Sequence, residues 1–218
     1  MRLLKLPSYD QSRMRLLRQR PRNAVFELVF TVVIALGLAL CVQAYALKPY
    51  RIPSQSMEPT LAVGQRVLVN RLSHRLGSEP HVGDIIVFHP PVGADSEACG
   101  DRNSGNGTKQ PCARTMPTED TQNFIKRVVA VGGDTIAIVH GHAIRNGRPA
   151  AEPFAAACTD ASGCDFPNAI KVPAGHVFVM GDNRGDSDDS RYWGPVPTSW
   201  VIGRAFATYW PPGRVGTL

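Results

Sequence analysis

Two serines stand two positions apart, Ser54 and Ser56, in the segment YRIPSQSMEPTL that runs from Tyr50 to Leu61. A serine hydroxyl is a weak nucleophile until a neighbouring base takes its proton. Either serine is therefore a candidate nucleophile if the chain supplies a base. An ordinary turn would also account for the sequence Pro-Ser-Gln-Ser.

Histidine is the usual base, but the chain has no G-x-S-x-G elbow and none of its six histidines has a triad-like local signature. Lys126, in FIKRVVAV, is the alternative. In a strand it would share a face with Phe124, Val128 and Ala130, an apolar surface that desolvates an ammonium. Burial lowers the pKa of a lysine, and the neutral amine can then accept a serine proton. A lysine that extends into solvent from a sheet edge is the competing interpretation.

The third polar feature is the run GDNRGDSDDSRYWG, Gly181 to Gly194. Its four aspartates suggest a calcium site, but their spacing lacks the glycine at loop position six and the glutamate at position twelve that an EF-hand loop needs. A structured turn that presents polar groups to a neighbouring site fits better. We expect Asp189 and Arg191 to pair and brace this turn, and either Ser187 or Ser190 to face the lysine.

The elements that must position these residues begin with an apolar run, LVFTVVIALGLALCVQAYAL, from Leu28 to Leu47. Twenty helical residues span about 30 Å, the thickness of a bilayer core. We therefore predict one transmembrane helix over residues 24–47. A cleavable signal peptide is the alternative, because Ala44-Tyr45-Ala46 is an A-x-A cleavage pattern, although the run is longer than a usual signal core.

Charge is distributed unevenly along the chain, whose net charge is +6. Residues 1–23 hold seven basic and one acidic side chain, whereas the remaining residues hold 17 of each. A neutral body has no field with which to gather phosphates, so a nucleic-acid partner is disfavoured. The positive-inside rule instead predicts a cytoplasmic tail over residues 1–23 and an extracytoplasmic body over residues 48–218.

Four of the five cysteines lie in that body, as the close pairs Cys99 with Cys112 and Cys158 with Cys164. An even number of exported cysteines suggests disulfides in an oxidising compartment. Short-range pairing is the expectation, but the sequence leaves the other two connectivities open. A zinc site is the alternative, although no C-x-x-C spacing is present, and we expect neither a metal nor a cofactor.

The body gives mainly β signals, in short apolar runs separated by Gly, Pro, Asn and Asp. Expected strands are 66–70, 84–88, 124–131, 135–140, 176–180 and 200–209. Two stretches look like excursions from this core. Residues 93–122 suggest an inserted arm closed by the first cysteine pair, and the stretch between Arg145 and Lys171 suggests a small satellite subdomain or cap that holds the other pair.

Four motifs follow one another along the chain: PSQSMEPTL, GDIIVF at Gly83 to Phe88, KRVVAVGGD at Lys126 to Asp134, and GDNRGDSDDSRYWG. In this order they resemble the bacterial type I signal peptidases, membrane-anchored serine endopeptidases that use a Ser-Lys dyad. The resemblance implies a β-rich catalytic core with a smaller second β subdomain over about residues 135–171. It also implies cleavage of N-terminal signal peptides from exported preproteins, after small residues at positions one and three before the cut.

Carried over to this chain, the resemblance implies Ser56 as nucleophile and Lys126 as general base. Ser54 looks like an oxyanion-hole donor together with the backbone N–H of Ser56, and Ser187 like the serine that orients the lysine. The residues that resemble structural groups near the site are Gly181, Asp182, Asn183, Asp189 and Arg191. Those that resemble walls of the substrate pockets are Tyr50, Ile52, Leu61 and Ile125. Cys158 and Cys164 look like a disulfide found in some members.

The implied partners are preproteins delivered by the export machinery and the lipid bilayer, with the enzyme in the bacterial inner membrane and its catalytic domain in the periplasm. Some members have two spans where this chain shows one, and the arm with Cys99 and Cys112 is outside the family pattern. Lys126 favours the bacterial type, since reticulum members have histidine there. The rival functions are a specialised pilus- or conjugation-type maturation peptidase and an inactive, membrane-tethered binding protein.

Overall fold

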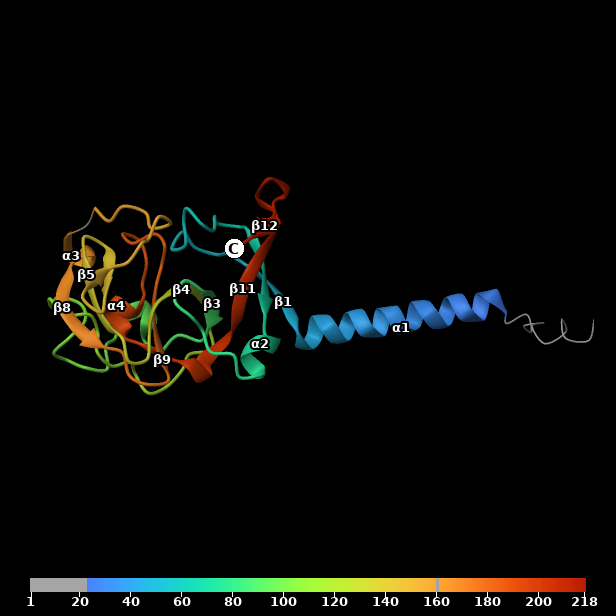
Figure 1. The fold of residues 1–218 in the computed structure, drawn as a ribbon, viewed down its shortest axis with the longest axis horizontal. Helices are drawn as coiled ribbons and strands as arrows, with labels where there is room; N and C mark the ends of the chain where they lie inside the picture. Colours follow the sequence, from blue (N-terminus) through green and yellow to red (C-terminus); the bar gives the residue numbers. More distant parts are fainter. Residues whose placement is uncertain (1–22, 160) are drawn as a thin grey trace, which may run out of the picture. The chain divides into compact units, whose positions relative to one another are not determined.

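The computed structural model describes residues 23–159 and 161–218. The basic tail predicted for residues 1–23 therefore lies outside the described residues, apart from Asn23. The chain divides into two compact units, residues 1–42 and 43–218. Figure 1 shows the long helix of the first unit and the strand-rich second unit.

The first unit contains most of helix α1, Ala24–Tyr45. The helix begins after Asn23, whose carbonyl oxygen accepts hydrogen bonds from the N–H groups of Phe26 and Glu27. Every described side chain of α1, over residues 24–40, is exposed. Among the residues that the structure describes, no helix meets both the length and the hydropathy that a membrane crossing requires. The helix ends at Tyr45, and Leu47 is already part of the first strand.

The second unit is built on an eight-stranded antiparallel sheet with the order β1-β2-β11-β3-β4-β9-β10, to which β12 adds by pairing with β11. Its strands are β1 (Leu47–Arg51), β2 (Arg66–Asn70), β3 (Ile85–Phe88), β4 (Phe124–Val131), β9 (His176–Met180), β10 (Val196–Pro197), β11 (Val201–Trp210) and β12 (Gly216–Thr217). Short helices complete it: α2 (Leu72–Arg75), α3 (Ala161–Cys164) and α4 (Ser190–Trp193). β4 lies between β3 and β9 and is therefore an internal strand.

A smaller four-stranded sheet has the order β7-β6-β5-β8. Its strands are β5 (Thr135–Val139), β6 (His142–Arg145), β7 (Arg148–Pro149) and β8 (Phe166–Lys171). Within the second unit, β5 and β8 lie at the end opposite to β1 and β11 (Figure 1). This sheet occupies the stretch in which the sequence suggested a second subdomain.

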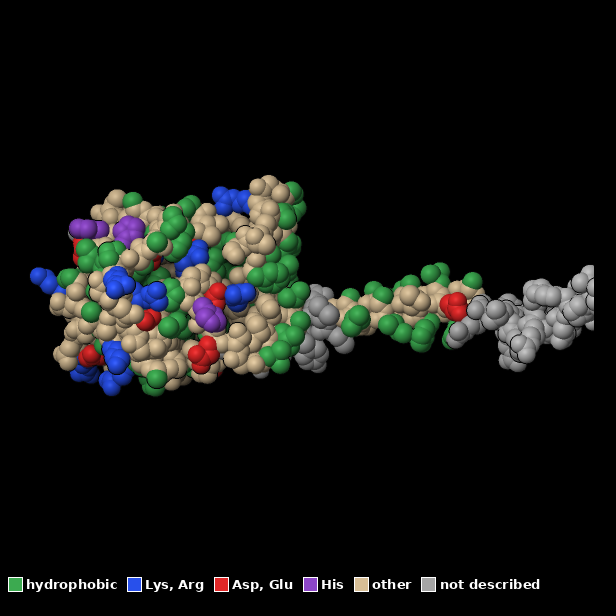
Figure 2. Space-filling view, viewed as in Figure 1, with side chains coloured by type: hydrophobic (Ala, Val, Ile, Leu, Met, Phe, Trp, Pro, Cys, Tyr) green, Lys and Arg blue, Asp and Glu red, His purple; other side chains and the backbone are tan. Residues whose placement is uncertain are grey.

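Three buried clusters form the core. One joins the two sheets through residues such as Ile136, Phe166 and Phe178. A second surrounds Phe88 and Trp193, and a third holds Met57 and the inner face of β2. On the surface, hydrophobic side chains gather along the edge of the second unit that carries β11 and β12 (Figure 2). The exposed ones there include Tyr209, Trp210 and Val215.

All six predicted strand runs contain strands, and mainly β structure is confirmed. One packing expectation is wrong. The predicted apolar face of Lys126, Val128 and Ala130 is interrupted, because the pairing of β4 with β9 shifts register between Val128 and Ala130. Such an irregularity ends the strict alternation of side chains. Val128 accordingly packs in one core cluster and Ala130 in another.

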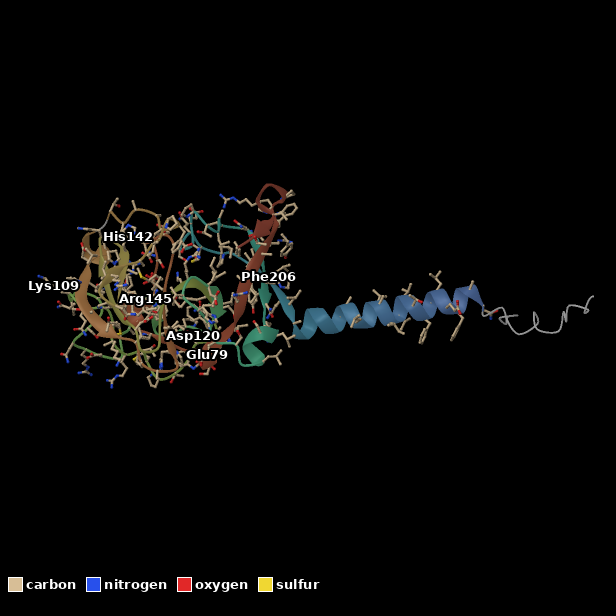
Figure 3. The ribbon with its side chains drawn as sticks, in the orientation of Figure 1. Glu79, Lys109, Asp120, His142, Arg145 and Phe206 are labelled. Atoms are coloured by element: carbon tan, nitrogen blue, oxygen red, sulfur yellow. A yellow bond between two sulfur atoms is a disulfide. The ribbon has the colours of Figure 1, made fainter. Side chains whose placement is uncertain are left out.

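Among the described residues, the cysteines of the second unit form the disulfides Cys99–Cys112 and Cys158–Cys164. The short-range pairing is therefore the one that forms. Residues 93–122, hereafter the arm, leave the core between β3 and β4. At the base of the arm Pro91 pairs with Glu119, and the N–H of Asp120 donates to the carbonyl of Pro90 at 2.7 Å. In Figure 3 the labelled Asp120 marks this base and Lys109 marks the part of the arm that lies beside β8.

Candidate functional site

The loop between β1 and β2 holds Ser54 and Ser56 by burying its apolar side chains. Met57 and Leu61 are fully buried, and the N–H of Leu61 donates to the carbonyl of Met57 at 2.8 Å. The Ser56 side chain is mostly buried, whereas Ser54 is exposed. Their hydroxyl oxygens lie 3.3 Å apart. Burial of these apolar side chains thus places two neighbouring hydroxyls at the surface of the core.

Lys126 lies on the internal strand β4, opposite Ile86 of β3. Only 4% of its surface is exposed. Its Nζ donates to Ser187 Oγ at 3.0 Å and lies 5.9 Å from the centre of the Phe124 ring. Burial lowers the pKa of Lys126 to about 8, although the charges of Asp189 and Asp188 oppose this change. An amine in this setting is partly neutral near physiological pH and can act as a base.

The turn between β9 and α4 contains Ser187 and Ser190, the two serines that could contact the lysine. Ser187 Oγ accepts the bond from Lys126, whereas Ser190 Oγ accepts a bond from the N–H of Val179 at 3.0 Å. Ser190 therefore holds α4 onto β9. Of the two serines that the sequence left open, Ser187 is the one that contacts the amine.

Asp189 and Arg191 form a fully buried pair that braces this turn. Arg191 Nε and Nη2 donate to the two carboxylate oxygens of Asp189 at 2.8 and 3.0 Å. Nη2 also donates to the carbonyl of Ser187 at 3.1 Å, and Asp189 accepts from the N–H of Gly181 at 3.0 Å. Burial alone would raise the pKa of Asp189, but the Arg191 guanidinium holds it below its usual value.

Residues 181–183 join this turn to the serine loop. The N–H of Asn183 donates to the carbonyl of Ser56 at 3.1 Å. Gly181 packs so closely that a Cβ there would overlap both the carbonyl oxygen of Ser56 and Ser187 Oγ. Asp182 is fully buried and accepts hydrogen bonds from Thr60 and Arg127. Ser56 and Ser187 therefore both pack against Gly181.

Side chains of this region line an open cleft of about 590 Å³, hereafter the serine–lysine cleft. Ser56 and Lys126 both line it, and so does Ser54. Its other lining residues come from the serine loop, from the base of the arm and β4, and from the 181–191 turn: Pro53, Gln55, Val63, Asp95, Gln122, Asn123, Phe124, Ile125, Asp186 and Asp188.

The four expected pocket residues divide between the cleft and the core beneath it. Ile125 lines the cleft. Ile52 and Leu61 are almost completely buried in the third core cluster, against which Tyr50 and Ile125 pack. Val63, which the sequence did not single out, is 52% exposed and lines the cleft.

Sequence reasoning also missed two ion pairs that connect the site to the rest of the fold. Arg127 donates to both carboxylate oxygens of Asp182, at 2.8 and 2.7 Å. Arg184 donates to both carboxylate oxygens of Glu152, at 2.8 and 2.7 Å, and to the carbonyl of Gly181 at 3.0 Å. Each pair joins residues that lie far apart in the sequence, and no local pattern marks such partners.

Comparison with known proteins identifies the family. The family model described as "Signal peptidase, peptidase S26" matches residues 25–210. The chain belongs to this family. It is 36% identical over 198 residues to "Probable signal peptidase I-1" of Synechocystis sp., with 91% of this chain and 89% of the relative covered.

Two further relatives agree. "Signal peptidase I" of Leptolyngbya laminosa is 34% identical over 196 residues, with 90% of this chain and 85% of the relative covered. "Signal peptidase I" of Mycobacterium tuberculosis (strain ATCC 25618 / H37Rv) is 36% identical over 235 residues, with 92% and 78% covered. The chain is accordingly an enzyme of the signal peptidase I type, a serine peptidase and hydrolase.

Proposed function

We propose that this peptidase removes N-terminal signal peptides from exported preproteins, with Ser56 as nucleophile and Lys126 as general base. The observation that carries the proposal is the environment of Lys126. Its amine is buried, bonds to Ser187 and has its pKa lowered to about 8, and it lines the same cleft as Ser56. At pH 7 about one tenth of such amines are neutral, which suffices for proton abstraction.

The reaction follows from these groups. Neutral Lys126 takes the hydroxyl proton as Ser56 Oγ attacks the carbonyl carbon of the scissile peptide. The hydroxyl of Ser54, close to that of Ser56, stabilises the oxyanion together with the N–H of Ser56. Protonated Lys126 then gives its proton to the leaving amine, and an acyl-enzyme remains. A water deprotonated by the same lysine hydrolyses this ester and regenerates Ser56.

We propose that the cleavage site has small side chains one and three positions before the cut, as in A-x-A. The apolar cleft residues Val63 and Ile125 support this preference, since they offer shallow hydrophobic contacts next to Ser56. Ile125 packs against the core cluster that holds Ile52 and Leu61. Because this core is tightly packed, it cannot yield to make the pocket deeper.

We also propose that residues 24–47 anchor the enzyme in the bacterial cytoplasmic membrane, with residues 1–23 in the cytoplasm and the body in the periplasm. The exposure of apolar side chains along α1 supports this, including Phe26, Val33 and Leu40, because water is an unfavourable environment for such a surface. The seven basic residues of the tail favour this orientation. The same membrane would present preproteins that the export machinery delivers.

Cleavage of a preprotein with an A-x-A site tests the proposal. Lys126→Arg keeps the positive charge but cannot act as a base, because arginine does not deprotonate in proteins. We expect no turnover by Lys126→Arg or by Ser56→Ala, and product from the wild-type chain measured by mass spectrometry. Substantial turnover by Lys126→Arg would refute the dyad.

The same assay separates the alternatives. A specialised maturation peptidase would leave a general preprotein uncut while it cleaves a narrow set of substrates through the same dyad. An inactive binding protein would cut none of them.

A further inference from the structure

The arm packs against the end of the turn whose Ser187 accepts a hydrogen bond from Lys126. Cys112 is fully buried, and its N–H donates to the carbonyl oxygen of Arg191 at 2.9 Å. A Cβ at Gly194, just after α4, would lie 2.7 Å from the backbone nitrogen of Thr115. A Cβ at Gly105 would lie 3.0 Å from the carbonyl oxygen of Tyr192. The arm backbone therefore fits tightly along residues 191–194.

The second disulfide loop reaches the same arginine. Gly163 lies between Cys158 and Cys164, and its carbonyl oxygen accepts a hydrogen bond from Arg191 Nη1 at 2.5 Å. The backbone carbonyl of Arg191 is thus bound by one disulfide-closed loop and its guanidinium by the other. Both groups of atoms that contact Arg191 therefore belong to segments closed by a disulfide.

Arg191 connects these segments to the lysine. Its Nη2 donates to the carbonyl of Ser187, and Ser187 Oγ accepts from Lys126 Nζ at 3.0 Å. The charged groups that act on Lys126 are Asp189, Asp188, Arg191 and Asp186, which all belong to this turn. The position of the turn therefore decides both the hydrogen bond and the charge around the amine.

We propose that the arm, closed by Cys99–Cys112, is a positioning element for Lys126 that holds the Ser187 turn over the amine through Arg191. The arm forms no part of the shared family motifs, yet it contacts the turn directly. This inference rests on the proposed role of Lys126 as base. It assigns to the disulfide a function in catalysis besides the stabilisation of a loop.

Loosening the arm should raise the pKa of Lys126. Burial is the main cause of the lowered pKa of Lys126, so water that enters beside a displaced turn raises that pKa toward its ordinary value of 10.5. At a fixed pH below this pKa, each unit by which the pKa rises reduces the neutral fraction of Lys126 about tenfold. The loss of activity is then largest at neutral pH and disappears at alkaline pH.

Two sets of variants of the full-length chain test this. Cys99→Ala/Cys112→Ala opens the arm. Arg114→Ala loosens it without touching a disulfide, because Arg114 Nε and Nη2 both donate to the carbonyl of Gly100 across the arm. Arg102→Ala is the matched control, since Arg102 is also an exposed arginine of the arm. Thermal unfolding checks that each variant is folded.

The readouts are the pH profile of kcat/KM for preprotein cleavage and an NMR titration of the Lys126 side-chain nitrogen in the Ser56→Ala background. We expect the open arm to shift the acid limb and the titration upward by about one pH unit, a loss of about tenfold at pH 7. Arg114→Ala should shift both in the same direction by less, and Arg102→Ala should shift neither.

An acid limb and a titration that stay in place in folded variants overturn the proposal, whether activity is unchanged or falls equally at every pH. If the double cysteine variant does not fold, Arg114→Ala against Arg102→Ala decides the question. The titration needs no turnover. A wild-type chain that fails to cleave preproteins therefore contradicts the proposed function, whereas an unshifted titration contradicts the role of the arm.

Discussion

Replacement of Gly181 by alanine should lower the activity of the enzyme about 100-fold while it leaves the chain folded. Gly181 follows β9 and packs closely against both the carbonyl oxygen of Ser56 and the side chain of Ser187. Its φ is outside the left-handed region, so the backbone accepts alanine without strain. The effect of the added methyl group is therefore purely a matter of space.

The size of the effect follows from the contacts. The new Cβ would lie 2.6 Å from Ser187 Cβ, whereas ordinary contacts begin at 3.4 Å, so the two must separate by at least about 0.8 Å. It would also overlap Ser187 Oγ and the carbonyl of Ser56. A misplacement of about 1 Å near reacting groups costs about 10²-fold in rate. Overpacking of this kind costs about 1–3 kcal/mol of stability.

We therefore expect kcat/KM for a preprotein with an A-x-A site to fall about 100-fold, mainly through kcat. Gly185→Ala is the matched control, because Gly185 lies in the same turn, its φ is ordinary and a Cβ there meets nothing within 4 Å. Steady-state kinetics and thermal unfolding are measured on wild type and both variants. The control should keep wild-type kinetics.

Two results would refute the reasoning. One is a folded Gly181→Ala enzyme with wild-type kcat, which would mean that Ser56 and Ser187 need not keep their positions against residue 181. The other is an equal loss of activity in Gly185→Ala, which would mean that the turn tolerates no alanine for a reason other than contact with the two serines.

Two further predictions concern charge. Asp188→Asn removes a charge that raises the pKa of Lys126, so that pKa falls below about 8 and the acid limb of the kcat/KM profile moves to lower pH; an upward or absent shift would contradict this. Glu152→Ala leaves the Arg184 guanidinium, only 1% exposed, without its carboxylate partner. It should lower the free energy of unfolding by about 3–5 kcal/mol in urea titrations, and a loss under about 1 kcal/mol would contradict the structural importance of the pair.

Features that depend on local pattern could be predicted from the amino-acid sequence. Alternating apolar runs between Gly, Pro, Asn and Asp indicated the strands that became β2, β3, β4, β5, β9 and β11. The sequence did not indicate the two-residue strands β7, β10 and β12, nor the longer strands β1, β6 and β8; residues such as Lys48, Pro49 and Pro167 interrupt the pattern in β1 and β8. Motif order indicated the family, and the type and spacing of Ser54, Ser56 and Lys126 made them candidates for chemistry.

The fold determines which of these groups are in contact. It placed Ser187 rather than Ser190 on Lys126, because Ser190 is held by the N–H of Val179. It selected the short-range disulfides, and it brought Asp95 and Gln122 from the base of the arm into the serine–lysine cleft.

These outcomes depend on contacts between segments that are distant in the chain. Lys126 and Ser187 are 61 residues apart, and Glu152 and Arg184 are 32 apart. Local propensity carries no information about such pairs, because their distance is set by sheet register and by how the loops pack. The burial that lowers the pKa of Lys126 has the same origin, since it arises from its internal place in the sheet and from the turn that covers it.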